Sequence, residues 1–159
     1  MANYAANNSP VASQQALTTT FKTLVVLTAS NGTALRRGQL YELDWGQSAA
    51  PNATDCDIVY DVSRQTAAGT VSAMVPLPID PADAAALTVC GVNATVEGTI
   101  TANSSVWSKA VNQRNSASWQ AAPGGELVWP ATNLAGLAMR ALSPTYVGTV
   151  QLNGHFTER

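Results

Sequence analysis

The stretch Val92-Asn-Ala-Thr-Val-Glu-Gly-Thr-Ile-Thr-Ala102 alternates small or apolar residues with polar residues along its whole length. Successive side chains of a β-strand point to opposite faces, so a period of two predicts a strand with one buried and one exposed face. A shift of one residue would turn every apolar side chain toward water. We therefore expect residues 92–102 to form one strand with a well-defined register.

Segments on both sides of this stretch have strand patterns too. Residues 21–28 are apolar on both faces and rich in β-branched side chains, which is typical of a strand buried in a sandwich. Residues 40–45, 57–62 and 146–156 alternate instead. The side chains expected to face the core are Tyr41, Leu43, Trp45, Ile58, Tyr60, Val62, Val150, Leu152 and Phe156. Those expected to face outward are Glu42, Asp44, Asp57, Asp61, Thr149, Gln151, Asn153 and His155.

One short helix is predicted at residues 80–87. Asp80 is a favourable N-cap and Pro81 suits the first helical position. Gly91 can end the helix. A helix of about two turns is too short to be stable without packing against a sheet. We therefore expect this helix to lie on the body of the domain.

The order of these elements predicts one all-β domain, an antiparallel β-sandwich or jelly roll with one short helix. Turn signals such as Asn31-Gly32 and Pro123-Gly-Gly125 separate the strands, and the alternation of strands and helices typical of α/β folds is missing from the pattern. The domain is expected to cover residues 20–159. Residues 1–19 are polar and aperiodic, which predicts an extended N-terminal arm that is disordered or ordered on a neighbouring subunit.

Charged residues make up only 11% of the chain, against about 25% in an average soluble domain. Ala, Ser, Thr, Asn, Gln and Gly take their place. Such a surface loses little ionic hydration when it is covered, and the cores of protein–protein interfaces are depleted of charge in the same way. The composition therefore favours a homo-oligomer or a component with a largely covered surface. The alternative is a low-charge, Ala-rich globular protein.

Nucleic acid and membranes are not expected partners. The net charge is −2, and only Arg36 and Arg37 are adjacent among the basic residues, so the sequence predicts no basic groove. No uncharged apolar run approaches the ~18 residues of a membrane span. The N-terminus has no basic and apolar leader pattern. We expect synthesis and assembly in a cytoplasm, with Cys56 and Cys90 as thiols.

The sequence predicts no metal site, no cofactor and no enzymatic activity. Two Cys and one His are too few for a closed zinc site. His155 is the single histidine, and without a nucleophile motif it is expected to be a surface or interface residue. Paired carboxylates could still support glycoside hydrolysis. However, Asp57 and Asp61 fit the solvent-facing side of an alternating strand, and Asp80 fits a helix cap.

Six residues are candidates for contact with a partner: Tyr4, Arg36, Arg37, Trp119, Trp129 and His155. Trp119 and Trp129 flank the turn at residues 123–125, and aromatic side chains often anchor interfaces. Trp45 alternates with core-facing residues and is expected in the core. An aromatic platform for sugar binding is the competing interpretation of the tryptophans.

Several segments resemble small jelly-roll proteins encoded with the head genes of tailed bacteriophages, the capsid cement or decoration type. The resemblance covers most of residues 20–159, and its motifs are not catalytic signatures. The segments that carry it are Leu35–Leu40, Val59–Thr70, Pro78–Leu87, Asn112–Trp119 and Ala121–Leu127.

The resemblance implies a protein that sits on the capsid exterior as an oligomer, commonly a trimer, and ties adjacent major capsid protein subunits together. An oligomer that bridges several capsomers gains avidity from effective concentration. Two other functions stay open at this point. One is a tail, neck, baseplate or host-glycan-binding module, and the other is a small glycan-active enzyme.

Overall fold

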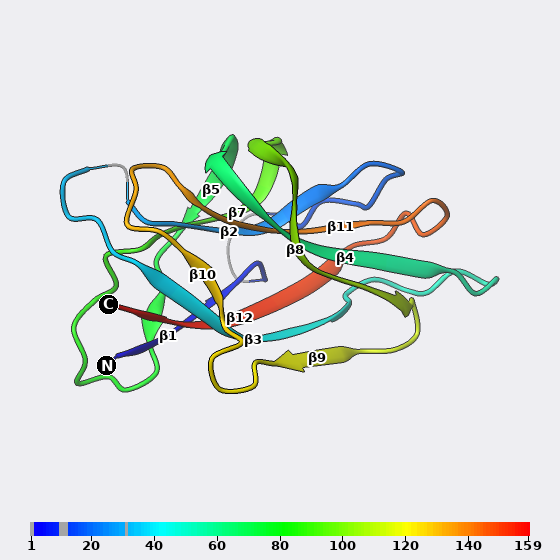
Figure 1. The fold of residues 1–159 in the computed structure, drawn as a ribbon. Coiled ribbons are helices and arrows are strands. Elements are labelled where there is room, and N and C mark those ends of the chain that lie inside the picture. Colours follow the sequence, from blue (N-terminus) through cyan, green and yellow to red (C-terminus); the bar gives the residue numbers. More distant parts are fainter. Residues whose placement is uncertain (1, 10–12, 31) are drawn as a thin grey trace.

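The computed structural model describes residues 2–9, 13–30 and 32–159, and within these ranges every regular element is a strand (Figure 1). The strands form two antiparallel six-stranded sheets, consistent with a β-sandwich. The predicted all-β class is therefore confirmed. Among the described residues no helix is long and apolar enough to cross a membrane.

The first sheet has the order β10-β3-β12-β1-β6, and β9 pairs with β3 on the same edge as β10. Its strands are β1 (Asn3–Asn7), β3 (Gly38–Gln47), β6 (Leu77–Pro78), β9 (Ala117–Gln120), β10 (Leu127–Trp129) and β12 (Val150–Glu158). The second sheet has the order β5-β7-β2-β11-β4-β8. Its strands are β2 (Lys22–Thr28), β4 (Asp57–Ala67), β5 (Thr70–Met74), β7 (Val89–Val96), β8 (Thr99–Asn112) and β11 (Gly136–Leu142).

The core lies between the two sheets and is filled by the strand faces that the alternation predicts. Ile58, Tyr60 and Val62 of β4 are buried, as are Val150, Leu152 and Phe156 of β12. Residues 23–28 of β2 are buried on both faces, as expected. Tyr41 is an exception: β3 pairs Glu42 with His155 and Leu40 with Phe156, so Tyr41 is an extra residue. This bulge leaves Leu40 in the core and Tyr41 half-exposed.

The prediction of a single strand over residues 92–102 is wrong. The chain turns at Glu97–Gly98, which separates β7 from β8. A Cβ atom on Gly98 would lie 2.2 Å from the carbonyl oxygen of Ala67, and one on Gly69 would lie 2.3 Å from that of Val96. The two turns therefore pack against each other through glycines. In the sequence pattern Gly98 counts only as one more small residue, which hides the turn.

Residues 57–74 and 89–112 together form one long two-stranded ribbon. Its register runs from Asp57 opposite Asn112 to Met74 opposite Cys90. The ribbon bends at the two glycine turns, at the top of Figure 1. Before the bend β4 pairs with β11, and beyond it β7 pairs with β2. The β2–β11 pair therefore lies between the two halves of the ribbon.

The predicted helix at residues 80–87 is absent. The Asp80 side chain accepts a hydrogen bond from the Ala82 amide (2.9 Å), as a cap does, but the structure stops after one turn. The amides of Leu87 and Thr88 donate instead to the Glu158 carboxylate, at 3.1 and 2.5 Å. These tertiary contacts replace the backbone hydrogen bonds that a second helical turn would need.

The described part of residues 1–19 packs on the domain itself, which corrects the prediction of an extended arm. Strand β1 pairs with β12 along its full length, and Tyr4, Ala6 and Leu17 are buried. Alternate small and aromatic side chains at positions 4 and 6 suit a strand that covers the edge of β12. Residues 1 and 10–12 of the expected arm, and Asn31 of the expected turn at 31–32, lie outside the described residues.

A buried ion pair lies on the face of β4 opposite the core. Asp61 alternates with core residues, as predicted, but it is not solvent-facing: only 4% of it is exposed. Arg140 of β11 donates to its carboxylate at 2.6 Å, and Ser63 and Ser105 donate to it as well. The Arg140 guanidinium also lies over the Phe21 ring. This group of contacts joins β4, β8 and β11.

Candidate functional surfaces

Two of the six predicted interface residues belong to the core. Tyr4 is buried in β1, where its ring stacks on Phe156 with centroids 5.4 Å apart and its hydroxyl donates to the carbonyl oxygen of Ala84 (3.1 Å). Trp129 is fully buried in β10 against Phe156 and Gly38. Neither side chain is available to a partner in this structure. Both predictions failed because they assumed a free arm and an exposed turn.

The other four candidates do not form one surface. Arg36 and Arg37 are exposed in the connection between β2 and β3. Trp119 is half-buried on β9, where it continues a row of rings through Trp107 to Trp45 at the side of the sandwich. His155 lies on the outer face of β12, and its Nδ1 is 2.7 Å from the Glu42 carboxylate.

A segment rich in exposed apolar side chains, which sequence reasoning missed, lies within residues 75–89. We call it the apolar margin; it comprises Val75, Leu77, Ile79, Leu87 and Val89, which are between 42% and 72% exposed. Leu77 lies in β6 at the edge of the first sheet, and Val89 begins β7 in the second sheet. The margin therefore bridges the two sheets.

The sequence around the margin explains why this edge of the sheet does not pair with a further strand. Pro76 and Pro78 flank Leu77 and carry no backbone N–H, so this edge cannot extend a β-sheet in the ordinary way. It presents apolar side chains instead of a free hydrogen-bonding ladder. The alternation of Val75, Leu77 and Ile79, directly before the expected helix, is the sequence signal for this surface.

The outer face of the first sheet carries a regular polar surface. We call it the polar face; its three rows across β12, β3 and the β9 side are Gln151, Gly46 and Ser116, then Asn153, Asp44 and Ser118, then His155, Glu42 and Gln120. Strand spacing places neighbours in a row roughly 4.8 Å apart. The predicted outward side chains of β3 and β12 are thus confirmed, and the pairing brings them together.

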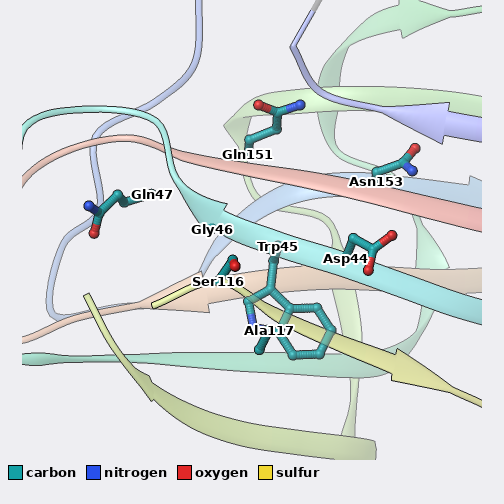
Figure 2. A pocket seen from close by; sticks show the side chains of 8 residues that line it. All are labelled: Asp44, Trp45, Gly46, Gln47, Ser116, Ala117, Gln151 and Asn153. Carbon is teal, nitrogen blue, oxygen red and sulfur yellow. The ribbon is translucent and has the colours of Figure 1, made fainter. Parts of the chain in front are cut away.

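A hollow opens in this face where Gly46 has no side chain (Figure 2). Its volume is about 340 Å³. Asp44, Gln151 and Asn153 rise on one side of the sheet, and Trp45 points to the other. A Cβ atom on Gly46 would meet Ser116 at 3.5 Å, an ordinary contact. Crowding therefore does not require a glycine at position 46. The lack of a side chain there leaves the hollow open.

Several polar groups around the hollow have no partner within the described residues. The Trp45 indole N–H and the Gln47 Oε1 atom are buried without a hydrogen bond, and the Trp45 ring lies on the core side of the sheet. Among the described residues, the Asp44 carboxylate, the Gln151 amide and the Ser116 hydroxyl make no hydrogen bond or ion pair with another side chain or with the backbone. Gln151 and Ser116 are exposed and Asp44 is half-buried, so these three groups are open to solvent or to a ligand.

The two cysteines are free thiols, as expected. Cys90 is buried in β7, and burial raises the pKa of its thiol to about 12. Cys56 is half-buried, with the Asn52 side chain 3.8 Å from its sulfur. Among the described residues no group of three or more His, Cys, Asp or Glu side chains is placed to hold a metal ion.

Neither a family model, nor a curated protein, nor a solved structure matches this chain.

Proposed function

We propose that this chain is a structural component of a virus particle, a cement protein on the exterior of a tailed-bacteriophage head. In this role it forms a homo-oligomer, commonly a trimer in the family it resembles, and ties adjacent major capsid protein subunits together. The proposal joins the sequence resemblance with one observation, the apolar margin.

The apolar margin supports attachment to another protein. Five large aliphatic side chains lie within residues 75–89 and are at least 42% exposed. Large apolar side chains exposed close together can mark a place where another surface docks, whereas single scattered ones are ordinary. The low charged fraction of 11% is in keeping with a surface that is covered after assembly. Capsid subunits and further copies of the chain are the partners we propose for it.

The bent ribbon supports the finer fold assignment within the sandwich class. A jelly roll is a double-sheet antiparallel fold in which long two-stranded ribbons fold over through Greek-key connections. Residues 57–74 and 89–112 are such a ribbon, with β2 and β11 between its halves. We therefore propose a jelly-roll topology for the domain.

Attachment to heads provides the direct test. Purified protein would be mixed with heads of the encoding phage from which it has been stripped, and the bound fraction measured by sedimentation. Because Leu77 and Ile79 are large and exposed, Leu77→Ser with Ile79→Ser should weaken binding by about tenfold or more. Val147→Ser is the matched control, since Val147 is 71% exposed and outside the margin.

Two outcomes would contradict the proposal. One is a stable monomer with no affinity for heads or for itself. The other is a copy number in purified virions of only a few chains, which would indicate a tail, neck or baseplate component. A carboxylate-to-amide variant that loses a hydrolytic activity without unfolding would instead identify a glycan-active enzyme.

A further inference from the structure

We propose that the polar face binds a neutral saccharide chain, with one sugar ring seated in the hollow above Gly46. This site is separate from the apolar margin and does not depend on attachment to a capsid. The inference rests on the shape of the hollow, its unpartnered polar groups and the sign of its charges.

The hollow has the size and position of a binding subsite. Ligand pockets begin at about 300 Å³, and the hollow measures about 340 Å³. A glycine inside a strand often marks a place where a ligand approaches the backbone closely. Gly46 lies between Gln151 and Ser116 in its row, so a ring above it would be within reach of an amide and a hydroxyl.

The polar groups around the hollow match sugar hydroxyls. The Asp44 carboxylate accepts hydrogen bonds, and the Gln151 and Asn153 amides both donate and accept them. Adjacent hydroxyls of a sugar need this mixture of donors and acceptors. The Ser116 hydroxyl, across Gly46 from Gln151, both donates and accepts hydrogen bonds as well.

The charges around the hollow select against anions. Asp44 is a carboxylate without a counter-ion among the described residues, and it would repel phosphate or an acidic sugar. Arg114 lies near Ser116, but its guanidinium is paired with Asp55 at 2.5 Å and also binds the Asn52 carbonyl oxygen. The polar lining does not suit a lipid. A neutral polyhydroxyl ligand remains.

The polar face continues beyond the hollow and so suits a chain of sugars. Asp44 and Asn153 form the next row, and His155 with Glu42 forms the third. There the Tyr41 ring stacks on His155 with centroids 6.2 Å apart. An aromatic ring offers a flat apolar surface, against which the carbon face of a second sugar can lie.

Titration with defined oligosaccharides tests the proposal. Maltohexaose, cellohexaose, chitohexaose and mannohexaose would be the neutral probes, and an oligogalacturonate the acidic one, followed by amide chemical shifts in NMR. We expect at least one neutral probe to bind with a Kd below about 10 mM. The shifts should map to β3, β9 and β12, and the oligogalacturonate should bind at least about tenfold more weakly.

Two variants and a control make the site assignment specific. Asp44→Asn removes the free carboxylate, and Gly46→Val fills the hollow with a side chain that strands accept; each should weaken binding by about tenfold or more. Asp57→Asn is the control, because Asp57 is an exposed aspartate on the other sheet. Circular dichroism of each variant would verify that the fold is kept.

The proposal fails if none of the four neutral probes binds at about 10 mM, or if the shifts map to other strands. It also fails if Asp57→Asn weakens binding as much as Asp44→Asn. Loss of head attachment in Asp44→Asn and Gly46→Val, without any saccharide binding by the unaltered protein, would identify the polar face as a protein interface instead. That result would leave the cement proposal standing.

Discussion

Asp61 and Arg140 form a pair of charges in the second sheet that has little contact with water. The Asp61 carboxylate accepts hydrogen bonds from Arg140, Ser63 and Ser105, which come from three strands. A buried ion pair is a weak source of net stability, but the loss of one partner leaves the other charge uncompensated. Removal of one partner should therefore lower the free energy of unfolding by more than the intact pair contributes to it.

We expect Asp61→Asn to lower the free energy of unfolding by about 3 kcal/mol. Arg140 would keep its charge while losing the carboxylate that neutralises it. Asp57→Asn, an exposed change on the same strand, should stay within about 0.5 kcal/mol. Urea unfolding followed by tryptophan fluorescence would measure both. Equal stabilities of the two variants would show that Arg140 finds another partner or water.

Cys90 should make stability fall in alkaline solution. Burial raises the pKa of its thiol from 9.0 to about 12. Above about pH 9 the unfolded chain releases this proton while the folded chain keeps it. The stabilisation is therefore complete below pH 9 and declines as the pH rises toward 12, by at most about 1.4 kcal/mol per pH unit.

The measurement is the free energy of unfolding between about pH 8 and 10, where tyrosine ionisation contributes least. Cys90→Ala should show a flatter pH dependence than the unaltered protein. Cys56→Ala is the control and should keep the slope, because Cys56 is only half-buried. If Cys90→Ala keeps the same slope, the thiol does not cause the alkaline decline.

At the scale of elements, the local sequence pattern predicted which segments form strands, but it did not predict where those strands end. Apolar side chains on both faces correctly identified β2, and the period of two identified the inner part of β3, the first half of β4 and most of β12. It joined β7 and β8 because Gly98 fits a small-residue position equally well in a strand and in a turn. The helix prediction failed because Glu158, distant in sequence, takes the amides of Leu87 and Thr88.

Gly98→Ala should destabilise the bend of the ribbon. The new Cβ atom would lie 2.2 Å from the Ala67 carbonyl oxygen, a backbone atom that cannot move alone. We expect a loss of about 2 kcal/mol, the usual cost of an overpacked site. Gly46→Ala is the control because its Cβ would make only an ordinary contact with Ser116. Thermal unfolding would compare the two, and equal melting temperatures would mean that the bend relaxes freely.

At the scale of the whole molecule, the candidate site was predicted only in fragments. The sequence pattern predicted which side chains of β3 and β12 face outward. It did not predict that Asp44 pairs with Asn153 or that Gly46 lies beside Gln151. Pairings of strands far apart in sequence depend on the complete topology, which local patterns do not contain. Tyr4 was misplaced for the same reason, since its burial depends on β12, at the opposite end of the chain.

Removal of residues 2–8 tests whether this segment belongs to the domain. Strand β1 covers β12 and buries Tyr4, Ala6 and Asn8. Loss of one large buried aromatic side chain alone costs about 3–5 kcal/mol, so the shortened protein should melt far lower or fail to fold. A mild version is Tyr4→Phe, which keeps the ring and should melt close to the unaltered protein. An unchanged melting temperature of the shortened chain would identify an exchangeable arm.

The ribbon also has a consequence for the order in which the chain folds. Its innermost pair, Met74 with Cys90, closes the loop that carries the apolar margin, and every later pair out to Asp57 with Asn112 adds to a ladder already begun. Closing a short loop first costs less chain entropy than bringing distant segments together. The segment that carries the apolar margin is therefore also the natural starting point of strand pairing, and changes in it are expected to alter the refolding rate.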